Sequence, residues 1–222
     1  TTPEAPDLHA LFAVMRERGV TAVAMEVSSH ALALGRVDGV RFAASVFTNL
    51  SQDHLDFHAD MEDYFRAKAS LLTPARSARG VVNADDAAGQ RLLADPQVPL
   101  TSYGEKGEFR AEQPSLRPDG SAFVLVGPGV RADASVQLPG AFNLSNALGA
   151  LACLVTVGVP VDDAARGVAA LPGVPGRMER VDAGQPFTAL VDYAHTPEAV
   201  TTLLRAVRDV TPGRVIVVLG CG

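Results

Sequence analysis

FAASVFTNLSQDHLDFH, residues 42–58, passes from a short apolar run directly into a dense polar segment. The run Phe42–Thr48 predicts a buried parallel strand, because such strands read as apolar runs that break into polar residues at their C-terminal ends. In open α/β sheets, ligands bind outside the carboxyl ends of the strands. The polar residues after this run therefore indicate a functional crevice in an α/β protein.

The segments around this stretch alternate between helix and strand patterns. Ala5–Gly19 places its apolar side chains on one helical face and stops at a glycine. The other helices predicted in this half are Met61–Leu72 and Asp85–Leu93, and the predicted strands are Thr21–Val27, Phe42–Thr48 and Arg79–Asn83. The alternation predicts an α/β domain with a mostly parallel sheet flanked by helices.

Between Pro99 and Pro139 the pattern changes to short strand-like pieces separated by Gly and Pro turns. We expect a small antiparallel addition there, built from Phe109–Gln113, Ala122–Val126 and Ala132–Leu138. Helical patterns return at Ala141–Val157 and Asp162–Leu171.

Pro172–Gly176 contains two prolines and two glycines, which indicates a domain boundary. After it we expect two strands, a helix and a strand, at Met178–Val181, Phe187–Val191, Glu198–Val210 and Arg214–Leu219. These elements are too few to close a core of their own. We therefore expect a first domain over residues 1–176 and the beginning of a second, Rossmann-like domain over residues 177–222, truncated at its C-terminus.

The composition narrows the choice of partners. The chain has 222 residues, of which 47% are hydrophobic and 20% charged, and a formal net charge of -6. Nucleic-acid binding normally shows as clustered Lys and Arg, so we expect no nucleic-acid partner. No apolar run approaches the ~18 residues of a membrane span, and the chain opens without a signal-peptide pattern. The two cysteines, Cys153 and Cys221, give no disulfide framework and fit a reducing cytoplasm.

Glu26 lies where the predicted strand Thr21–Val27 ends, next to Ser28, Ser29 and His30. A strand end is where this class of sheet forms a ligand site, so Glu26 is a candidate site residue. The alternative is that the carboxylate and the serines cap the helix that follows.

Asp53, His54, Asp56 and His58 gather oxygen and imidazole ligands within six residues, which indicates a divalent-metal site. The alternative is a polar loop in which an aspartate caps the next helix and the histidines lie at the surface.

Lys68 is spaced four residues from both Tyr64 and Leu72 in a predicted helix with apolar neighbours. This spacing places it on the partly buried face. A helical lysine more commonly extends to solvent or pairs at the surface, and that alternative stays open.

Asn143 and Asn146 open a predicted helix, where N–H groups and amide side chains can hold a nucleotide, although capping explains Asn143 equally well. Arg177, Asp192 and His195 flank the predicted domain boundary. An arginine there can neutralise a transferring phosphoryl group, and a carboxylate can bind ribose hydroxyls. An interdomain salt bridge is the alternative.

Nine segments, taken in order, resemble the Mur ligase family and, within it, the MurE type. They are Thr1-Thr2, MEVSSHAL (Met25–Leu32), TNLSQDHLDFH (Thr48–His58), DYFRAKASLL (Asp63–Leu72), VNADD (Val82–Asp86), GAFNLSNALGA (Gly140–Ala150), GRMERV (Gly176–Val181), DYAHTPEA (Asp192–Ala199) and LGCG (Leu219–Gly222). Together, MEVSSHAL and NLSQDHLDFH distinguish this type from the sister muramyl ligases and from the folylpolyglutamate synthetases, which share the fold.

The resemblance implies that a UDP-sugar-binding domain and a GKT phosphate loop precede Thr1, and that the rest of an amino-acid-binding domain follows Gly222. Within the chain no G-x-x-x-x-G-K-[ST] motif occurs. We therefore expect residues 1–176 to be a central ATP-binding domain truncated at its N-terminus. We also expect the isolated chain to have no ligase activity.

The resemblance also implies the roles of individual residues. Thr1, Thr2, Ser28 and Arg36 match positions that hold the UDP-muramoyl-dipeptide; Glu26, His54 and Lys68 match a magnesium site in which the lysine is carbamylated; and Asn143, Asn146, Arg177, Asp192 and His195 match positions around ATP. Leu34 departs from the family pattern, which commonly has a substrate-binding glutamine there.

The implied enzyme adds a diamino acid to UDP-N-acetylmuramoyl-L-Ala-D-Glu in cytoplasmic peptidoglycan synthesis and is a monomer at full length. The D-glutamyl carboxylate attacks the γ-phosphorus of ATP, and the resulting acyl phosphate reacts with the amine. Mg²⁺, held in part by carbamylated Lys68, and Arg177 neutralise the negative charge of the phosphates. The choice among meso-diaminopimelate, L-lysine and L-ornithine stays open. The rival interpretations are a metal-dependent phosphohydrolase, using Glu26 and the Asp53–His58 segment, and a non-catalytic nucleotide-binding module.

Overall fold

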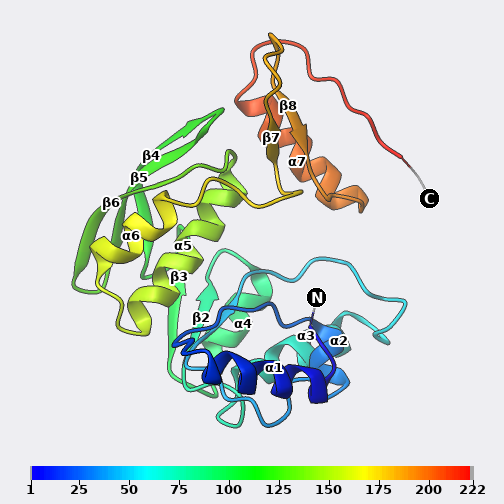
Figure 1. Ribbon diagram of the computed structural model, residues 1–222, viewed down its shortest axis with the longest axis vertical. Helices are drawn as coiled ribbons and strands as arrows, with labels where there is room; N and C mark the ends of the chain where they lie inside the picture. Colours follow the sequence, from blue (N-terminus) through cyan, green and yellow to red (C-terminus); the bar gives the residue numbers. More distant parts are fainter. Residues whose placement is uncertain (1, 221–222) are drawn as a thin grey trace. The chain divides into compact units, whose positions relative to one another are not determined.

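The computed structural model describes residues 2–220 of the chain and has the α/β fold class that the sequence predicts (Figure 1). It divides into two compact units, one ending at Tyr103 and the other beginning at Gly104. The first contains α1 (Ala5–Glu17), α2 (Ser29–Ala33), β1 (Ser45–Phe47), α3 (Met61–Ala69), the 3-10 helix η1 (Ser70–Leu72), β2 (Gly80–Asn83), α4 (Ala87–Ala94) and β3 (Leu100–Tyr103). The second contains β4 (Arg110–Arg117), β5 (Gly120–Gly127), β6 (Val130–Val136), α5 (Ala141–Thr156), α6 (Val161–Ala169), β7 (Glu179–Val181), β8 (Ala189–Val191) and α7 (Pro197–Asp209).

The sheet of the first unit is parallel and has the strand order β1-β2-β3. Apolar side chains from β1, β2, α3, η1, α4 and the segment before β3 form its core: Phe47, Phe65, Leu72, Val82, Ala88 and Val98. Helix α4 approaches β2 so closely that a Cβ on Gly89 would lie 1.9 Å from the carbonyl oxygen of Asn83. The carboxyl ends of β1 and β2 are thereby fixed beside the polar segment that follows β1.

Helices α1 and α2 share a second apolar cluster centred on the buried residues Leu8, Leu32 and Val37. Helix α1 begins with a proline and an acidic residue in its first turn, as helix N-termini commonly do. It ends before Gly19, whose φ of 75° suits a residue without a Cβ. The periodicity of Ala5–Gly19 therefore predicted this helix correctly.

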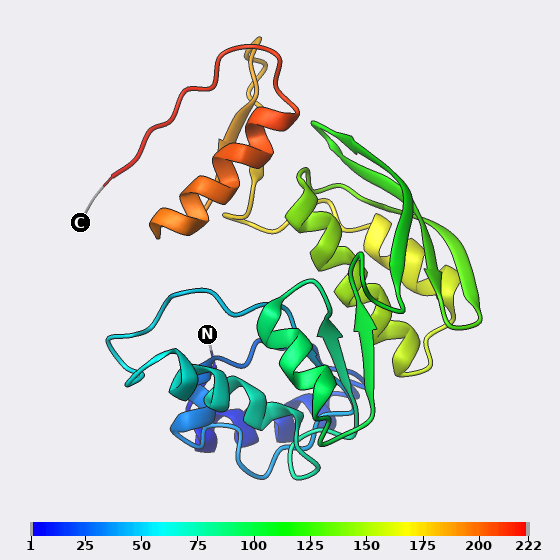
Figure 2. The ribbon, with the colours of Figure 1, turned by 180° about the vertical axis from the view of Figure 1, so that it is seen from behind.

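The second unit contains the predicted antiparallel addition. Strands β4, β5 and β6 pair antiparallel in that order, and alternate side chains of β5, including Phe123 and Leu125, are buried. Helices α5 and α6 lie against this sheet in both ribbon views (Figures 1 and 2).

Strands β7 and β8 form a separate antiparallel pair, and α7 runs alongside it in both views (Figures 1 and 2). Thr196 caps α7 by accepting a hydrogen bond from Ala199 N at 3.3 Å. The helix predicted at Glu198–Val210 and the strands predicted at Met178–Val181 and Phe187–Val191 are therefore present, with ends shifted by a few residues.

Two strand predictions were wrong. Thr21–Val27 and Arg214–Leu219 form no strand, because a strand needs a hydrogen-bonded neighbour and no described residue pairs with either segment. Val23 and Val218 accordingly stay exposed. A strand that was not predicted, Leu100–Tyr103, lies within the range Pro99–Pro139 where an antiparallel addition was expected, but it pairs in parallel with β2.

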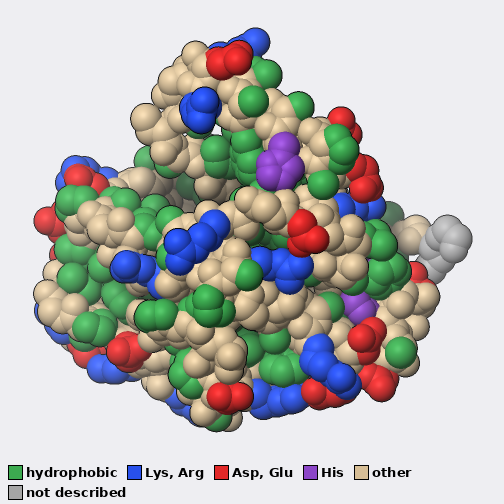
Figure 3. Space-filling view, turned by 90° about the horizontal axis from the view of Figure 1, so that it is seen from below, with side chains coloured by type: hydrophobic (Ala, Val, Ile, Leu, Met, Phe, Trp, Pro, Cys, Tyr) green, Lys and Arg blue, Asp and Glu red, His purple; other side chains and the backbone are tan. Residues whose placement is uncertain are grey.

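No helix among the described residues is long and apolar enough to cross a membrane. On the face drawn in Figure 3, basic and acidic side chains are interspersed rather than gathered by sign. This distribution suits the modest net charge of the chain and offers no dense basic area on that face.

Candidate functional site

Three of the four residues predicted to hold the dipeptide substrate contact one another. Thr2 is buried, and its Oγ1 donates to the carbonyl oxygen of Glu26 at 3.0 Å and accepts from Ser28 N at 3.3 Å. Arg36 donates from Nη1 to the carbonyl oxygen of Thr2 at 3.2 Å. The fourth residue, Thr1, lies outside the described residues. The structure thus brings together residues that are more than thirty positions apart in the chain.

The Arg36 guanidinium keeps one donor unused. Its Nη2 forms an ion pair with Glu4 Oε1 at 2.6 Å, whereas its Nε is buried without a hydrogen-bond partner among the described residues. The departure at Leu34 lies at the end of α2, where the side chain is exposed. The Arg36 side chain as a whole is 26% exposed, and a guanidinium anchored beside a buried threonine is suited to bind an anionic group.

Ser28 caps α2, since its Oγ accepts a hydrogen bond from Ala31 N at 3.1 Å. Glu26 does not cap this helix, and its side chain is exposed. No ion pair or hydrogen bond joins the Glu26 carboxylate to His54 or Lys68 in the part of the chain that the structure describes. The carboxylate is therefore available to a ligand.

Lys68 is partly buried on α3, as its spacing predicted. Its Nζ donates to the carbonyl oxygen of Asn49 at 2.7 Å and lies 5.4 Å from the centroids of both the Phe47 and the Tyr64 ring. Burial lowers the pKa of the Lys68 amine below its usual value, although the charges of Asp86 and Asp53 act in the opposite direction. The surface alternative for this lysine does not hold.

His54 lies close to the same tyrosine. Its ring centroid is 5.9 Å from that of Tyr64 and 4.8 Å from that of His30. Its backbone has a φ of 56°, an uncommon value for a residue with a side chain. Its Nε2 lies 3.6 Å from Asp53 Oδ2. His54, Asp53 and Lys68 are thus gathered around Tyr64.

A cluster of imidazole rings extends from His54 to His30 and His58. The ring centroids of His30 and His58 are 5.8 Å apart, and Phe57 packs on His30 at 4.1 Å. Burial lowers the pKa of His30, and the neighbouring His54 and His58 lower it further. His58 is buried, so the alternative in which both histidines of this loop lie at the surface fails for His58.

The side chains predicted to bind magnesium are Glu26, His54 and Lys68. Within residues 2–220, no group of three or more His, Cys, Asp and Glu side chains is placed to hold a metal ion. A lysine amine cannot bind a hard cation, but its carbamate supplies oxygen ligands of the kind magnesium prefers. The partial burial and lowered pKa of Lys68 favour the neutral amine that carbamylation needs. The residues therefore fit magnesium only if Lys68 is carbamylated.

Asn143 and Asn146 meet in the first two turns of α5. Asn143 is buried and donates from Nδ2 to the carbonyl oxygen of Pro139 at 2.8 Å, and Asn146 donates to Asn143 Oδ1 at 3.4 Å. The residue at the cap position of α5 is Gly140, with φ 96°. Asn143 thus ties down the helix start, and the more exposed Asn146 is the freer of the two amides.

Arg177, Asp192 and His195 gather around Tyr193. The Arg177 guanidinium lies 5.2 Å from the centre of the Tyr193 ring, and the His195 ring lies 5.0 Å from it. Both carboxylate oxygens of Asp192 accept backbone N–H groups, from Met178 and Ala194, at 2.8 Å each. Among the described residues no ion pair joins Arg177 to Asp192, whose two carboxylate oxygens are both occupied by backbone N–H groups.

Several participating residues were not predicted from the sequence. Asn49 acts through a backbone carbonyl, and Tyr193 is an exposed ring between two predicted residues. Asp86 acts on Lys68 across eighteen positions while it caps α4. The position of Tyr193 between Asp192 and His195 was the one available signal.

Comparison with protein families places the chain. A model of the Mur ligase middle domain matches residues 1–154, and a model of the Mur ligase glutamate ligase domain matches residues 176–222. The chain belongs to the Mur ligase family. The family resemblance drawn from the nine sequence segments is therefore confirmed.

Two curated relatives of this Mur ligase chain carry the same name. The UDP-N-acetylmuramoyl-L-alanyl-D-glutamate-2,6-diaminopimelate ligase of Streptomyces avermitilis is 56% identical over 227 residues, which cover all of the chain and 45% of the relative. The protein of that name from Corynebacterium glutamicum is 48% identical over 230 residues and is covered to 44%. The chain thus spans less than half the length of these relatives.

Solved structures show the same Mur ligase fold. A structure of a UDP-N-acetylmuramoyl-L-alanyl-D-glutamate-2,6-diaminopimelate ligase matches 95% of the chain and 44% of its own length, with a TM-score of 0.81 and 29% identity. MurF from Acinetobacter baumannii matches 76% of the chain and 38% of its own length, with a TM-score of 0.67 and 21% identity. The second likeness concerns the fold alone.

Proposed function

We propose that these 222 residues act within an enzyme of the length of its relatives, as an ATP-dependent ligase that adds 2,6-diaminopimelate to UDP-N-acetylmuramoyl-L-Ala-D-Glu. The observation that carries the proposal is Lys68, an amine held by a backbone carbonyl between two rings, with a lowered pKa, beside His54 and Asp53. Burial of the charged form of a lysine costs free energy, so this environment favours the neutral amine. The names of the relatives at 56% and 48% identity support the choice of substrates.

The reaction joins a carboxylate and an amine at the expense of ATP. An oxygen of the D-glutamyl carboxylate attacks the γ-phosphorus and ADP leaves, which gives an acyl phosphate. The diaminopimelate amine then attacks the acyl carbon, loses a proton, and expels inorganic phosphate as the amide bond forms. Phosphorylation converts a poor leaving group into a good one, so the protein contributes mainly position and charge neutralisation.

Each group of side chains has a part in this scheme. Thr2, Ser28 and Arg36, with Thr1, hold the UDP-muramoyl-dipeptide, the partly exposed guanidinium of Arg36 facing an anionic group. Asn143, Asn146, Asp192 and His195 hold ATP, and Arg177 neutralises the phosphoryl group in transfer. Tyr193 keeps the Arg177 guanidinium in place through its ring.

Glu26, His54 and the carbamate of Lys68 would hold magnesium. Bound magnesium neutralises charge on the phosphates during the transfer. The carbamate forms when the neutral Nζ attacks the carbon of CO₂ and loses a proton, which leaves an anion in place of a cation. We propose that the enzyme acts in the cytoplasm, as a monomer, without membrane or nucleic-acid partners.

The test is a reconstituted reaction with an enzyme of full length, Mg²⁺, ATP, the UDP-dipeptide and 2,6-diaminopimelate. We expect phosphate release and a UDP-tripeptide by mass spectrometry, both of which stop when the amine or the dipeptide is left out. Phosphate-ester cleavage without an amine acceptor would instead indicate a phosphohydrolase. Nucleotide binding with no turnover under any of these conditions would indicate a non-catalytic module.

A further inference from the structure

His58 is the most completely engaged histidine of the first unit. Its side chain is 2% exposed, and both ring nitrogens have partners. Nε2 lies 2.9 Å from Ser29 Oγ, and Nδ1 lies 3.3 Å from Asp63 Oδ2. The ring also stacks on Tyr64, with centroids 4.9 Å apart and planes 16° from parallel. One side chain thus joins the start of α2, the loop after β1 and the first turn of α3.

The chemistry of the partners orders the hydrogens along this chain of contacts. A carboxylate can only accept, so the proton on His58 Nδ1 points to Asp63. In the neutral ring Nε2 is then an acceptor, and the Ser29 hydroxyl donates to it. Asp63 Oδ2 additionally accepts from Ala59 N at 3.3 Å, which fixes the carboxylate from a second direction.

The backbone of the same residue closes the turn that begins at His54. His58 N donates to the carbonyl oxygen of His54 at 2.9 Å, and Phe57 N donates to the same oxygen at 3.1 Å. His54 has a positive φ of 56°, a conformation that persists only when the surroundings enforce it. The buried side chain of His58 anchors the far end of this turn and so helps to hold His54 in this conformation.

Serine, histidine and aspartate in hydrogen-bonded order also occur in hydrolases, where the serine is a nucleophile. That role does not fit Ser29. Its residue is 4% exposed and follows the cap of α2, so its hydroxyl cannot reach a substrate carbonyl. The arrangement instead holds elements together.

We propose that His58 is a positioning residue of the ligase: through Ser29 and Asp63 it locks the 54–58 turn, and it thereby orients His54 toward the metal site that His54 shares with Lys68. This inference rests on the proposed function. Tyr64 transmits the constraint, because its ring is stacked on His58 and lies within 6 Å of both the His54 ring and Lys68 Nζ.

The experiment compares His58→Gln with His9→Gln in the full-length enzyme. His9 is a matched control, because it is a histidine of the same unit that uses Nε2 for a hydrogen bond, to the carbonyl oxygen of Asp38, and has no place in the proposed site. We expect His58→Gln to raise the Mg²⁺ concentration for half-maximal rate by about tenfold or more, the range seen when supporting partners of metal ligands are lost. The KM for the UDP-dipeptide should change little, and His9→Gln should change neither quantity.

A second readout does not depend on activity. Hydrogen exchange of the Phe57 and His58 amides reports directly on the two hydrogen bonds to the His54 carbonyl. We expect faster exchange at both amides in His58→Gln and unchanged exchange in His9→Gln. If His58→Gln does not fold, Asp63→Ala weakens the same contacts from an exposed position and should shift both readouts in the same direction.

The outcomes separate the two proposals. Unchanged exchange at 57 and 58, or faster exchange with an unchanged Mg²⁺ requirement, would overturn the positioning role. A parent enzyme that makes no tripeptide would overturn the proposed function and this inference with it, and that failure is seen in the parent rather than in the variants.

Discussion

The Nζ of Lys68 and the carbonyl oxygen of Asn49 are joined by a hydrogen bond of 2.7 Å. This contact fastens helix α3 to the segment that leaves β1, and it holds the amine where burial lowers its pKa. Burying a cation there without a carboxylate in direct contact costs free energy, which favours the neutral form of the amine. The position of Lys68 depends on the packing of the first unit, and that packing can be tested directly.

Gly89→Ala tests the closest approach in the first unit. The new Cβ would lie 1.9 Å from the carbonyl oxygen of Asn83, so α4 must move away from β2. Overpacking of this kind typically costs about 1–3 kcal/mol. Gly167→Ala is the matched helical control: nothing lies within 4 Å of its Cβ, and it should raise stability by about 1 kcal/mol. Urea unfolding followed by circular dichroism measures both, and equal effects would contradict the packing described for α4.

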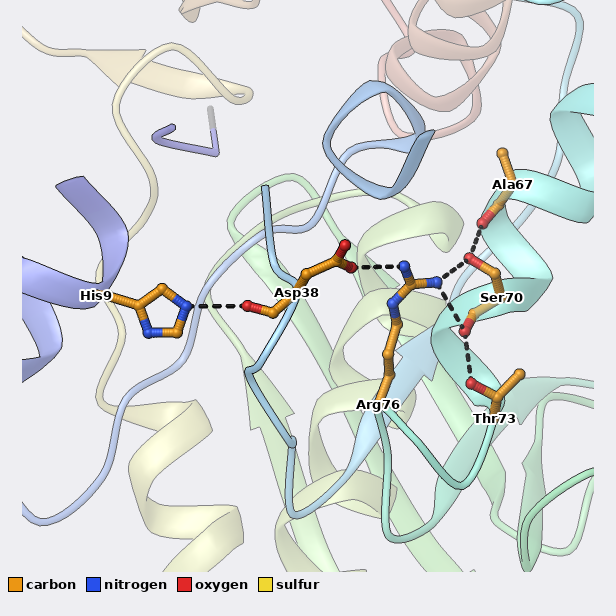
Figure 4. Close-up of polar contacts among 6 residues, drawn as sticks. All are labelled: His9, Asp38, Ala67, Ser70, Thr73 and Arg76. Carbon is orange, nitrogen blue, oxygen red and sulfur yellow. Dashed lines mark hydrogen bonds and ion pairs between the residues drawn. The ribbon is translucent and has the colours of Figure 1, made fainter. Parts of the chain in front are cut away.

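Arg76 is expected to matter more for stability than its acidic partner Asp38 (Figure 4). Arg76 donates from Nη2 to Asp38 Oδ1 and from Nη1 to Ser70 Oγ, each at 2.8 Å. The Asp38 side chain is 65% exposed, so Asp38→Ala should cost less than about 1 kcal/mol, and its backbone carbonyl can still accept from His9. Arg76→Ala also removes a cation from the end of α3 and should cost about 1.5–3 kcal/mol. The comparison requires urea unfolding of both variants, and a larger loss in Asp38→Ala would reverse the ranking.

Helices and the parallel core of the first unit could be predicted from the sequence because their signals are local. Residues 5–19 and 61–72 carry an apolar stripe at helical spacing, and the structure has α1 and α3 there. Strands are a property of pairs. Thr21–Val27 has the composition of a strand but no described neighbour to pair with, while Leu100–Tyr103 has a polar centre and pairs with β2 all the same.

In the candidate site, too, residues with a local sequence signal could be predicted, and contacts between distant segments could not. Lys68, His54 and Ser28 lie in motifs and Arg36 lies four residues after one, so the sequence could identify them. The links between them could not be identified, because Ser29 and His58 are 29 positions apart and the partner of Lys68 is a backbone carbonyl that any residue can supply. The sequence indicated His58 as a possible metal ligand rather than as a partner of Ser29, and it indicated Asp63 only as part of a helix and its motif.

Arg177→Ala should lower the turnover of a full-length enzyme by about 100-fold or more and leave binding of the UDP-dipeptide nearly unchanged. The reason is that its proposed partner is charge on the phosphoryl group in transfer, an interaction made in the transition state. Arg180→Ala is the matched control, since Arg180 lies three residues away, pairs with Asp182 and has no proposed role. Steady-state kcat and KM for the dipeptide provide the measurement. Equal losses in kcat and in dipeptide affinity would show that Arg177 does not act mainly on the phosphoryl group in transfer.

The last prediction concerns the carbamate on Lys68. A neutral amine must attack CO₂, and burial favours that neutral form, while a guanidinium in the same place stays a cation and can form no carbamate. In a full-length enzyme, Lys68→Ala should therefore fold but lose activity. The loss should exceed the ~10–100-fold seen when a residue that supports a metal ligand is mutated, and Lys68→Arg should not restore activity. Lys106, the other lysine of the chain, supplies the control, because Lys106→Ala should keep both activity and carbamate. With ¹³C-labelled bicarbonate, a carbamate resonance should be seen in the parent and in Lys106→Ala and be missing in both Lys68 variants. If Lys68→Arg is fully active, or if the resonance survives without Lys68, the amine held by Asn49 is not a carbamate, and the proposed magnesium site loses its main ligand.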